Sequence, residues 1–585
     1  MRSNRQDQHD PPQARCLWPP RRVLITLASL AAAVALVRGG LLEPIAGAIV
    51  DQAVLNIITL ILCFSGLMSL LIWFVRESGH PKPLKQMVLG GLLGGVVVAA
   101  GALRIERVSG DLVPEFNWRW APARDRLLER AAGIHGDASP WAATATDFPR
   151  FLGPAGTCGI DAPQLDPDWV ARPPRLVWKR PIGAGWSGFA TCGDHAVTLE
   201  QRGDEEVISC YAIPTGEPEW AVAVPARHET ILGGVGPRST PTIQDGVVYT
   251  TGATGWLHVI DGATGGIVWR KNILDDLGID VDKHIAAVAW GRAGSPLVTD
   301  DLVIVPAGGP RRKPLPDETE YVSLVAYDRA TGDRRWTAGD EQIAFTTPAL
   351  VTFGGREQVL IVNEAHVAAY DPADGRQLWQ VDWPGHSNSD ASCSQAVPID
   401  DRRFFVSKGY GIGAAVFEID AASLATADTL SWTARPVWQK PQLLKTKFTN
   451  VVLDEGHAYG LSDGILECVR LADGQRVWKR GRYGQGQVLR VGGLLVVQAE
   501  SGDVVLVEAG PAEHREVARL AAITGQTWNN PCLAGNRLLV RNAEEAACYE
   551  LPLVSQPVEA ESANAAPAAA AEGVDAEPVP VEVAP

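Results

Sequence analysis

The chain has no excess of basic residues. Its 52 Lys and Arg are outnumbered by 68 Asp and Glu, which gives a formal net charge of −16 at pH 7. Because binding to phosphates needs a basic face, we expect no nucleic-acid partner. The sequence also has no P-loop, no dinucleotide-binding glycine fingerprint and no G-x-S-x-G elbow. Nucleotide, nicotinamide and serine-hydrolase chemistry are therefore unsupported.

The nine cysteines form no CxxC motif, no CxxCH haem-attachment motif and no vicinal pair. Cys210, Cys468 and Cys548 stand in matching apolar contexts, so we expect them to be buried at equivalent strand positions. No two histidines have the sequence spacing of metal ligands. The sequence therefore predicts no metal site and assigns no catalytic residue.

Three apolar runs open the chain, at residues 23–37, 54–75 and 87–103. The middle run has the length of a membrane-spanning helix, while the outer two are short. None of the runs contains an ionisable residue, so they indicate an anchor in membrane lipid rather than a transport path. We predict a cluster of three transmembrane helices within residues 23–105.

Basic residues flank these runs unequally. Arginines are frequent before the first run, and a basic loop at 76–85 separates the second from the third. By the positive-inside rule, residues 1–22 lie in the cytoplasm and everything after residue 103 lies on the far side, the periplasm in a bacterial cell. The predicted location is the cytoplasmic membrane, in a multi-pass arrangement with the soluble domain facing the periplasm.

Tryptophan and glycine are frequent in the soluble region, where a short turn and a tryptophan recur. Five segments read AIPTGEPEW, DGATGGIVW, DRATGDRRW, DPADGRQLW and RLADGQRVW, with a degenerate ARPVW before the last. The Asp, Thr and Gly residues are those that hairpin turns prefer. With a further tryptophan in RLVWKRP, the residues predicted to dock on a neighbouring repeat are Trp178, Trp220, Trp269, Trp336, Trp379, Trp438 and Trp478.

A second feature recurs eight times: a polar step that leads into a short apolar strand, as in RSTPTI, AGSPLV and FTTPAL. Repeats of about 50 residues with four short strands are typical of β-propellers. We predict an all-β, eight-bladed propeller over residues 166–552, with seven blades as the alternative because the unit at 450–488 is short. The eighth unit has only three strands, so we expect the segment around Trp178 to complete it.

Two segments flank the predicted propeller. Residues 106–165 are expected to be a linker and lead-in, with one amphipathic helix within 114–130. Trp118 and Trp120 would lie at the membrane surface or pack on the propeller. Residues 553–585 contain no basic residue and are rich in Ala, Pro, Val and Glu, which predicts a disordered acidic tail.

The Thr-Gly turns at 215–216, 264–265 and 331–332, with the tryptophans that follow, resemble the tryptophan-docking repeats of PQQ-type (pyrroloquinoline-quinone) eight-bladed propellers. Residues 147–159 (DFPRFLGPAGTCG) resemble the lead-in of a subgroup of that family. The family includes quinoprotein dehydrogenases and non-catalytic relatives, such as the propeller lipoprotein of outer-membrane protein assembly. The resemblance therefore implies the fold and leaves the function open.

In a propeller the eight polar steps converge at one mouth of the central channel. The predicted ligand-binding residues there are Trp186, Arg238, Ser239, Thr240, Ser295, Thr347, Gln395, Asn450, Gln487, Trp528 and Asn529. We expect Arg238 to be the main charged contact of an acidic or quinone-like ligand. The alternatives are that the polar residues serve their own backbone and channel water, and that Arg238 pairs with an internal acid such as Glu229.

The polar steps contain no Asp or Glu, whereas the calcium and the base of a PQQ dehydrogenase need carboxylates. We therefore expect a membrane-anchored periplasmic propeller that acts as a non-catalytic binding or scaffold module, without a cofactor and with an envelope protein as partner. The alternative is a membrane-bound PQQ-dependent oxidoreductase that uses PQQ with calcium.

Overall fold

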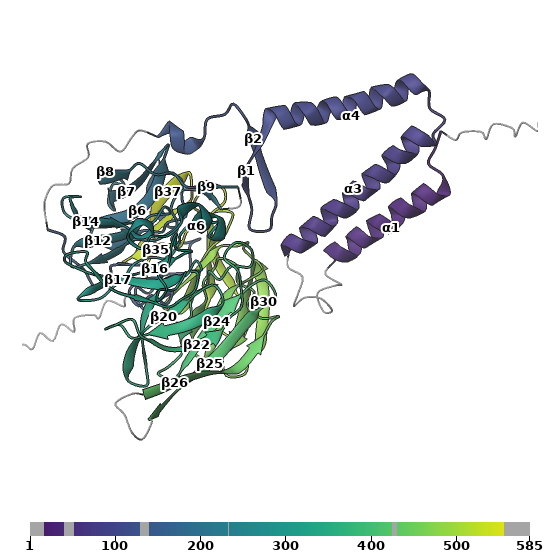
Figure 1. Cartoon of the computed structure of the whole chain (residues 1–585). Helices are drawn as coiled ribbons and strands as arrows, with labels where there is room; N and C mark the ends of the chain where they lie inside the picture. Colours follow the sequence, from purple (N-terminus) through teal and green to yellow (C-terminus); the bar gives the residue numbers. More distant parts are fainter. Residues whose placement is uncertain (1–16, 40–51, 129–139, 232, 424–429, 555–585) are drawn as a thin grey trace, which may run out of the picture. The chain divides into compact units, whose positions relative to one another are not determined.

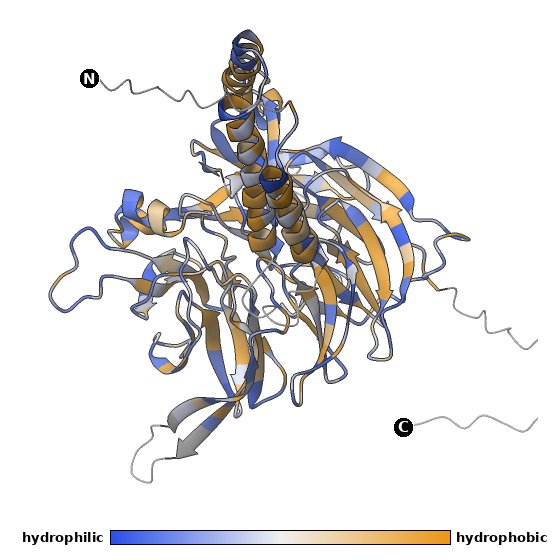
Figure 2. Ribbon diagram, turned by 90° about the vertical axis from the view of Figure 1, so that its right-hand side faces the viewer, coloured by the Kyte–Doolittle hydropathy of each residue, from blue (hydrophilic) through white to orange (hydrophobic). Residues whose placement is uncertain are grey.

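The computed structural model describes residues 17–39, 52–128, 140–231, 233–423 and 430–554. Its N-terminal part contains α1 (Arg21–Arg38), α3 (Gln52–Arg76) and α4 (Lys82–Ala102). Apolar residues dominate these helices (Figure 2), and α3 and α4 are long and apolar enough to cross a membrane. The three apolar runs are thus helical, as predicted. The predicted tail falls outside the described residues from 555 onward.

A β-hairpin follows α4 directly. Its strands, β1 (Leu103–Val108) and β2 (Pro114–Trp118), pair antiparallel. The prediction of an amphipathic helix within 114–130 is therefore wrong. The alternating PEFNW segment forms β2 and pairs with β1. Between β2 and residue 128, the described residues contain only a 3-10 helix, η1 (Arg124–Leu127). Trp118 and Trp120 stack with ring centroids 5.1 Å apart and are 52% and 70% exposed, so neither enters the propeller core.

Eight sheets, antiparallel except for one short added strand, form the propeller (Figure 1), and their number excludes the seven-bladed alternative. The sheets are numbered here as blades in chain order. Blade 1 comprises β5 (Ala190–Cys192), β6 (His195–Arg202), β7 (Glu205–Ala212) and β8 (Pro218–Val224). Blade 2 comprises β11 (Thr242–Gln244), β12 (Val247–Thr251), β13 (Trp256–Asp261) and β14 (Ile267–Asn272). Blade 3 comprises β15 (Leu297–Val298), β16 (Leu302–Gly308), β17 (Val322–Asp328) and β18 (Arg334–Ala338). Blade 4 comprises β19 (Ala349–Phe353), β20 (Arg356–Val362), β21 (His366–Tyr370) and β22 (Gln377–Asp382).

The second half of the ring continues the pattern. Blade 5 comprises β23 (Val397–Pro398), β24 (Arg403–Lys408), β25 (Gly413–Ser423) and β26 (Leu430–Lys440). Blade 6 comprises β27 (Val452–Asp454), β28 (His457–Ser462), β29 (Ile465–Arg470) and β30 (Gln475–Arg482). Blade 7 comprises β31 (Gln487–Val491), β32 (Leu494–Gln498), β33 (Asp503–Glu508) and β34 (Glu516–Ala521), with β3 (Gly159–Ile160) added. Blade 8 comprises β35 (Cys532–Ala534), β36 (Arg537–Arg541), β37 (Glu545–Glu550) and β4 (Arg175–Pro181). A short pair, β9 (Glu229–Thr230) and β10 (Gly234–Val235), lies between blades 1 and 2, and α5 (Ile273–Asp276) and α6 (Val281–Ala287) lie between blades 2 and 3.

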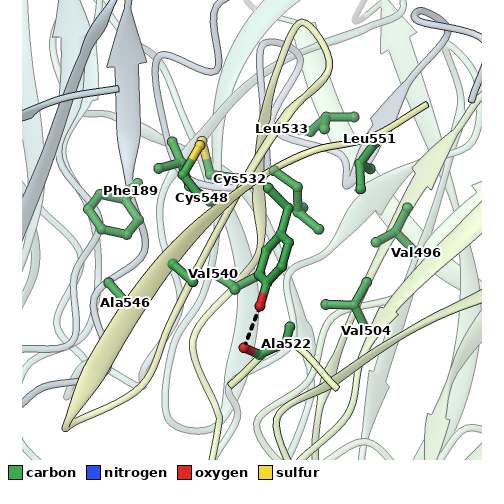
Figure 3. Close-up of a cluster of buried hydrophobic side chains, with 14 of the residues drawn as sticks. Phe189, Val496, Val504, Ala522, Cys532, Leu533, Val540, Ala546, Cys548 and Leu551 are labelled. Atoms are coloured by element: carbon green, nitrogen blue, oxygen red, sulfur yellow. Dashed lines mark hydrogen bonds between the residues drawn. The ribbon is translucent and has the colours of Figure 1, made fainter. Parts of the chain in front are cut away.

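The cores lie between adjacent blades. Middle strands are covered on both faces, which explains why a strand such as β16 is buried along its whole length and has no polar face. The ring closes as predicted, because β4 completes blade 8 and places Trp178 opposite Cys548. Figure 3 shows the core at this closure, where Phe189 of blade 1 and Val496 of blade 7 pack against blade 8. The Tyr549 hydroxyl donates to the Ala522 carbonyl there, at 2.8 Å.

Six of the seven predicted docking tryptophans donate a hydrogen bond from the indole N–H to the next blade. The indole N–H of Trp178 donates to the Ile213 carbonyl in the β7–β8 turn of blade 1, at 2.7 Å, and that of Trp220 donates to the Gly262 carbonyl in blade 2, also at 2.7 Å. Trp269, Trp336, Trp438 and Trp478 make the same contact with the following blade. Trp379 differs, because it donates to Gln358 Oε1 of its own blade at 2.8 Å.

A glycine of the turn makes this contact possible. Gly216 has a φ of +74°, and a Cβ at that position would lie 2.6 Å from the Trp178 ring. A side chain would therefore clash with the indole and strain the backbone. The Thr-Gly turn and the tryptophan of the preceding blade form one structural unit.

The lead-in segment hydrogen-bonds to the inner strands of three blades. The amides of Thr191 and Ile243, in the inner strands of blades 1 and 2, donate to the carbonyls of Phe148 and Pro149 at 2.9 and 2.7 Å. The Arg490 amide of blade 7 donates to the Cys158 carbonyl at 2.8 Å. The segment thus holds inner strands from both sides of the ring closure.

Replacing Trp178 with Ala should weaken the closure of the ring. The variant loses a buried ring and leaves the Ile213 carbonyl unpaired, so we expect a loss of about 3–5 kcal/mol in unfolding free energy, measured by denaturant or thermal unfolding of the full chain in detergent. Trp120→Ala is the control, because its exposed ring should matter by about 0.5 kcal/mol or less. Equal stability of the two variants would contradict this account of the closure.

Candidate functional site

Polar side chains at the strand starts hydrogen-bond to the backbone of the preceding blade. Thr240 Oγ1 accepts from the Gly188 amide at 3.1 Å, Ser295 Oγ from the Thr240 amide at 2.9 Å, and Thr347 Oγ1 from the Ser295 amide at 3.0 Å. The series continues from blade to blade, because Gln395 Oε1 accepts from the Thr347 amide and Asn450 Oδ1 from the Gln395 amide, both at 3.1 Å.

Two amide side chains complete this inter-blade ring on the other side. The Gln487 side-chain amide donates to the carbonyls of Phe448 and Trp528, at 2.9 and 3.0 Å. The Asn529 side-chain amide donates to the carbonyls of Gly185 and Ser187, at 3.2 and 2.8 Å. The contacts therefore reach from blade 6 through blades 7 and 8 back to blade 1. Most of the predicted polar site residues are used in this way.

Each strand start contains three consecutive residues, called here the first, second and third positions, and their surroundings differ. In blade 2 they are Arg238, Ser239 and Thr240. The third position, occupied for example by Thr240, contributes to the inter-blade ring. The second position bonds within its own blade in some blades, as Ser239 does by donating to the Thr251 carbonyl. In others it bonds to the next blade, as Ser394 and Asn529 do. The first position holds Trp186, Arg238, Ala293, Phe345, Cys393, Phe448, Gln485 and Trp528, and all of these except Gln485 line a central cavity.

The cavity has a volume of about 420 Å³, and its walls are mainly apolar with several aromatic rings. The rings of Trp186 and Trp528, from blades 1 and 8, have centroids 4.7 Å apart, and Phe448 lies 4.6 Å from Trp528. On the other side Trp290 and Phe345 stack at 5.5 Å. Such walls suit a flat or apolar group.

Arg238 supplies a cation to this cavity. Its guanidinium donates to the Gly236 carbonyl at 2.6 Å and to the Gly233 carbonyl. Across the described ranges, no carboxylate oxygen forms an ion pair with it within 4.0 Å. Glu229 pairs instead with Arg227, at 2.8 Å. Burial lowers the pKa of Arg238 to about 9, and the charge of Glu206 partly offsets that effect.

Glu206 is a buried carboxyl near Arg238. It is 2% exposed and accepts a hydrogen bond from the Ala253 amide at 2.9 Å. Burial raises its pKa to about 7, although the Ala253 amide and Arg238 act in the opposite direction. Burial, followed by the charge of Arg238, lowers the pKa of His228 to about 3. Arg238 is therefore only partly neutralised, which leaves a cationic group for an anionic ligand.

The tip of the β1–β2 hairpin lies at the mouth formed by the strand starts. The Gly110 amide donates to Glu500 Oε1 at 3.0 Å, and Lys447 Nζ donates to the Gly110 carbonyl at 3.3 Å. Ala53, Val54 and Ile57 at the start of α3 also line the cavity. The first turns of α3 and the hairpin that follows α4 thus contribute to the site.

Of the residues predicted for the site, five line this cavity: Trp186, Arg238, Asn450, Gln487 and Trp528. Phe345 and Phe448 also line it and were missed. Both stand two residues before a third-position residue, just as Arg238 stands before Thr240. Aligning the steps at the third position would have revealed them. Trp290 and Lys447 have no such repeated offset, and the hairpin tip carries no sequence signal for this location.

The lining residues do not fit calcium-bound PQQ. Calcium prefers several oxygen ligands, with carboxylates prominent among them. Among the described residues that line the cavity there is no Asp or Glu, and the charged side chains are Arg238 and Lys447. The donor set therefore suits an anion better than a divalent cation.

Comparison with known proteins agrees with this architecture. The family described as outer membrane protein assembly factor BamB, a PQQ-repeat family, matches residues 203–480, from blade 1 into blade 6. The soluble domain is a PQQ-type propeller. This propeller is also similar to outer membrane protein assembly factor BamB of Burkholderia pseudomallei, with 24% identity over 335 residues, which cover 52% of this chain and 81% of the relative.

Solved structures similar to the PQQ-type propeller include both functional classes. BamB of Moraxella catarrhalis is 16% identical with a TM-score of 0.45, and the match covers 65% of this chain and all of that one. Quinohemoprotein alcohol dehydrogenase of Comamonas testosteroni is 13% identical with a TM-score of 0.46, over 71% of this chain and 82% of that one. These similarities concern the fold and do not choose between the classes.

Replacing Glu206 with Gln should change how the stability of the PQQ-type propeller depends on pH. Because the folded pKa of this carboxyl, about 7, exceeds its ordinary value of 4.5, the folded state loses stability as pH rises through that interval. We expect Glu206→Gln to have a higher Tm than the wild type at pH 8, with a difference that shrinks toward pH 5. Glu217→Gln, in an exposed turn, is the control. A difference independent of pH would refute the assignment.

Proposed function

We propose that this protein is a membrane-anchored propeller of the cell envelope that acts as a non-catalytic binding module. The observation that carries the proposal is the composition of the channel site: the polar strand starts are engaged in the inter-blade ring, and the lining residues offer aromatic rings and Arg238 without a carboxylate. Such a site can hold a group but has no evident base or calcium ligand set.

The anchoring part of the proposal rests on α3 and α4, the two helices apolar enough to span a membrane. Successive spans run in opposite directions, so the start of α3 and the end of α4 would lie on the same side. In keeping with this, Asn56 near the start of α3 donates to the Asp111 carbonyl in the hairpin that follows α4, at 2.8 Å. The basic flanks favour the periplasm for this side.

The binding part of the proposal rests on the cavity and on the relatives. We propose that Arg238 holds an acidic group of the ligand while Trp186 and Trp528 flank it. Because the similar family is described as an outer membrane protein assembly factor, an envelope protein is the proposed partner. The propeller would then present this partner with a site fixed close to the membrane.

A cofactor assay separates this proposal from the oxidoreductase alternative. The purified full chain in detergent, incubated with PQQ and calcium, should show no stoichiometric PQQ absorbance after gel filtration and no alcohol- or sugar-dependent dye reduction, because carboxylate ligands are lacking. Bound PQQ with dye reduction would establish the alternative. In that case Arg238→Ala should weaken PQQ binding at least about tenfold, since a charged hydrogen bond contributes roughly 1.5–3 kcal/mol.

Reporter fusions test the orientation. Alkaline phosphatase fused after Leu103 should be active, and a fluorescent protein that folds only in the cytoplasm should stay dark when fused there. The reason is that the basic loop at 76–85 stays in the cytoplasm, so the chain after the next helix lies on the opposite side of the membrane. A fusion within that loop serves as the control and should give the reverse pattern. Inactive phosphatase with a bright fluorescent fusion after Leu103 would disprove a periplasmic propeller.

A further inference from the structure

Three side chains that commonly bind metals converge on blade 1, away from the residues that line the channel cavity. His195 begins β6, Cys210 lies in β7 and Glu219 lies in β8. His195 Nδ1 lies 2.7 Å from Glu219 Oε2, and Cys210 Sγ lies 3.1 Å from the same oxygen. All three ligand atoms lie within 4.8 Å of one another.

The cluster is shielded on one side and accessible on another. Cys210 is fully buried, whereas the side chains of His195 and Glu219 are each 28% exposed. The Trp141 ring stacks on the His195 ring with centroids 4.7 Å apart and an interplanar angle of 11°. An ion can thus reach the cluster from solvent while the indole limits the movement of the imidazole.

Blade 6 contains the same pair of ligands without the third. His457 begins β28 as His195 begins β6, and Cys468 lies opposite Trp478 as Cys210 lies opposite Trp220. The residue before that tryptophan is Val477 in blade 6 and Glu219 in blade 1. The His–Cys pair therefore recurs with the repeat, and Glu219 is what completes the trio in blade 1.

We propose that His195, Cys210 and Glu219 form a zinc-binding site with an open fourth position. Imidazole nitrogen, thiolate sulfur and carboxylate oxygen are all zinc ligands, and three protein ligands leave one place for water or an external group. Tetrahedral zinc at usual bond lengths separates its ligand atoms by roughly 3.3–3.6 Å. The His195–Glu219 and Cys210–Glu219 ligand atoms, now 2.7 and 3.1 Å apart, need to separate by about 0.5–0.7 Å to reach that geometry.

Charge and proton balance are consistent with Zn²⁺. The Cys210 thiol loses its proton to solvent and forms the Zn–S bond, while ionised Glu219 and neutral His195 bind through Oε2 and Nδ1, with the imidazole proton on Nε2. The two negative ligands neutralise the ion. No group is oxidised or reduced, and one proton is released for each zinc ion bound.

Cobalt(II), as a coloured substitute for zinc, gives a direct test on the full chain in detergent. One equivalent should produce a cobalt–thiolate charge-transfer band that excess zinc removes. The band should be lost in Cys210→Ser and retained in the matched control Cys468→Ser. Glu219→Val, which gives blade 1 the blade 6 arrangement, and the milder Glu219→Gln should weaken metal binding at least about tenfold.

Proton release supplies an independent measurement. In weak buffer the wild type and Cys468→Ser should release about one proton for each zinc ion bound at this site, and a folded Cys210→Ser should release none there. Thermal unfolding without metal shows which variants are folded. A wild type without the thiolate band, or a Cys210→Ser variant with an undiminished band and proton release, would overturn the site.

Discussion

The structure depends on the hydrogen bonds that link each inner strand start to its neighbouring blade. Buried backbone amides and carbonyls must be paired, and at the strand starts of this propeller many of the pairing groups come from the neighbouring blade. Thr240, Ser295 and Thr347 satisfy amides of this kind, and Gln487 and Asn529 satisfy carbonyls across the closure. The polar character of the steps is therefore primarily a requirement of the fold.

This constraint leaves mainly the first position of each strand start to determine the chemistry of the channel, although Asn450 and Gln487 of the inter-blade ring also line the cavity. The first positions hold Trp186, Arg238, Phe345, Phe448 and Trp528, so the cavity is aromatic and cationic. The lead-in bonds to the inner strands of blades 1, 2 and 7, and the hairpin tip contacts Glu500 and Lys447 at the mouth formed by the strand starts. A ligand site with these walls depends on contact with flat rings and on the positive charges of Arg238 and Lys447 more than on a set of neutral polar groups.

Local repeats made the fold predictable. The Thr-Gly turns, the tryptophans and the polar steps each occupy a few adjacent residues, and they gave the blade number and the closure by β4. The hairpin at 103–118 was not predicted because β1 and β2 form by pairing with each other, and the two segments taken separately do not show this pairing. Phe345 and Phe448 were missed because their place in the cavity follows from their position two residues before a third-position residue. The cluster of His195, Cys210 and Glu219 was missed because its members lie on three strands and meet through the pairing register of those strands, which sequence spacing does not show.

The closure by β4 also determines when the propeller can exist during biosynthesis. β4 lies near residue 178 and is made before any complete blade, yet its partner β37 ends at Glu550. A chain made from its N-terminus must therefore keep this strand unpaired while the whole ring is synthesised between the two. Until then both ends of the ring are open strand edges, which readily pair with other chains. The nascent chain would thus have to be kept from pairing with other chains until β37 has been made, and only then could the ring of blades close.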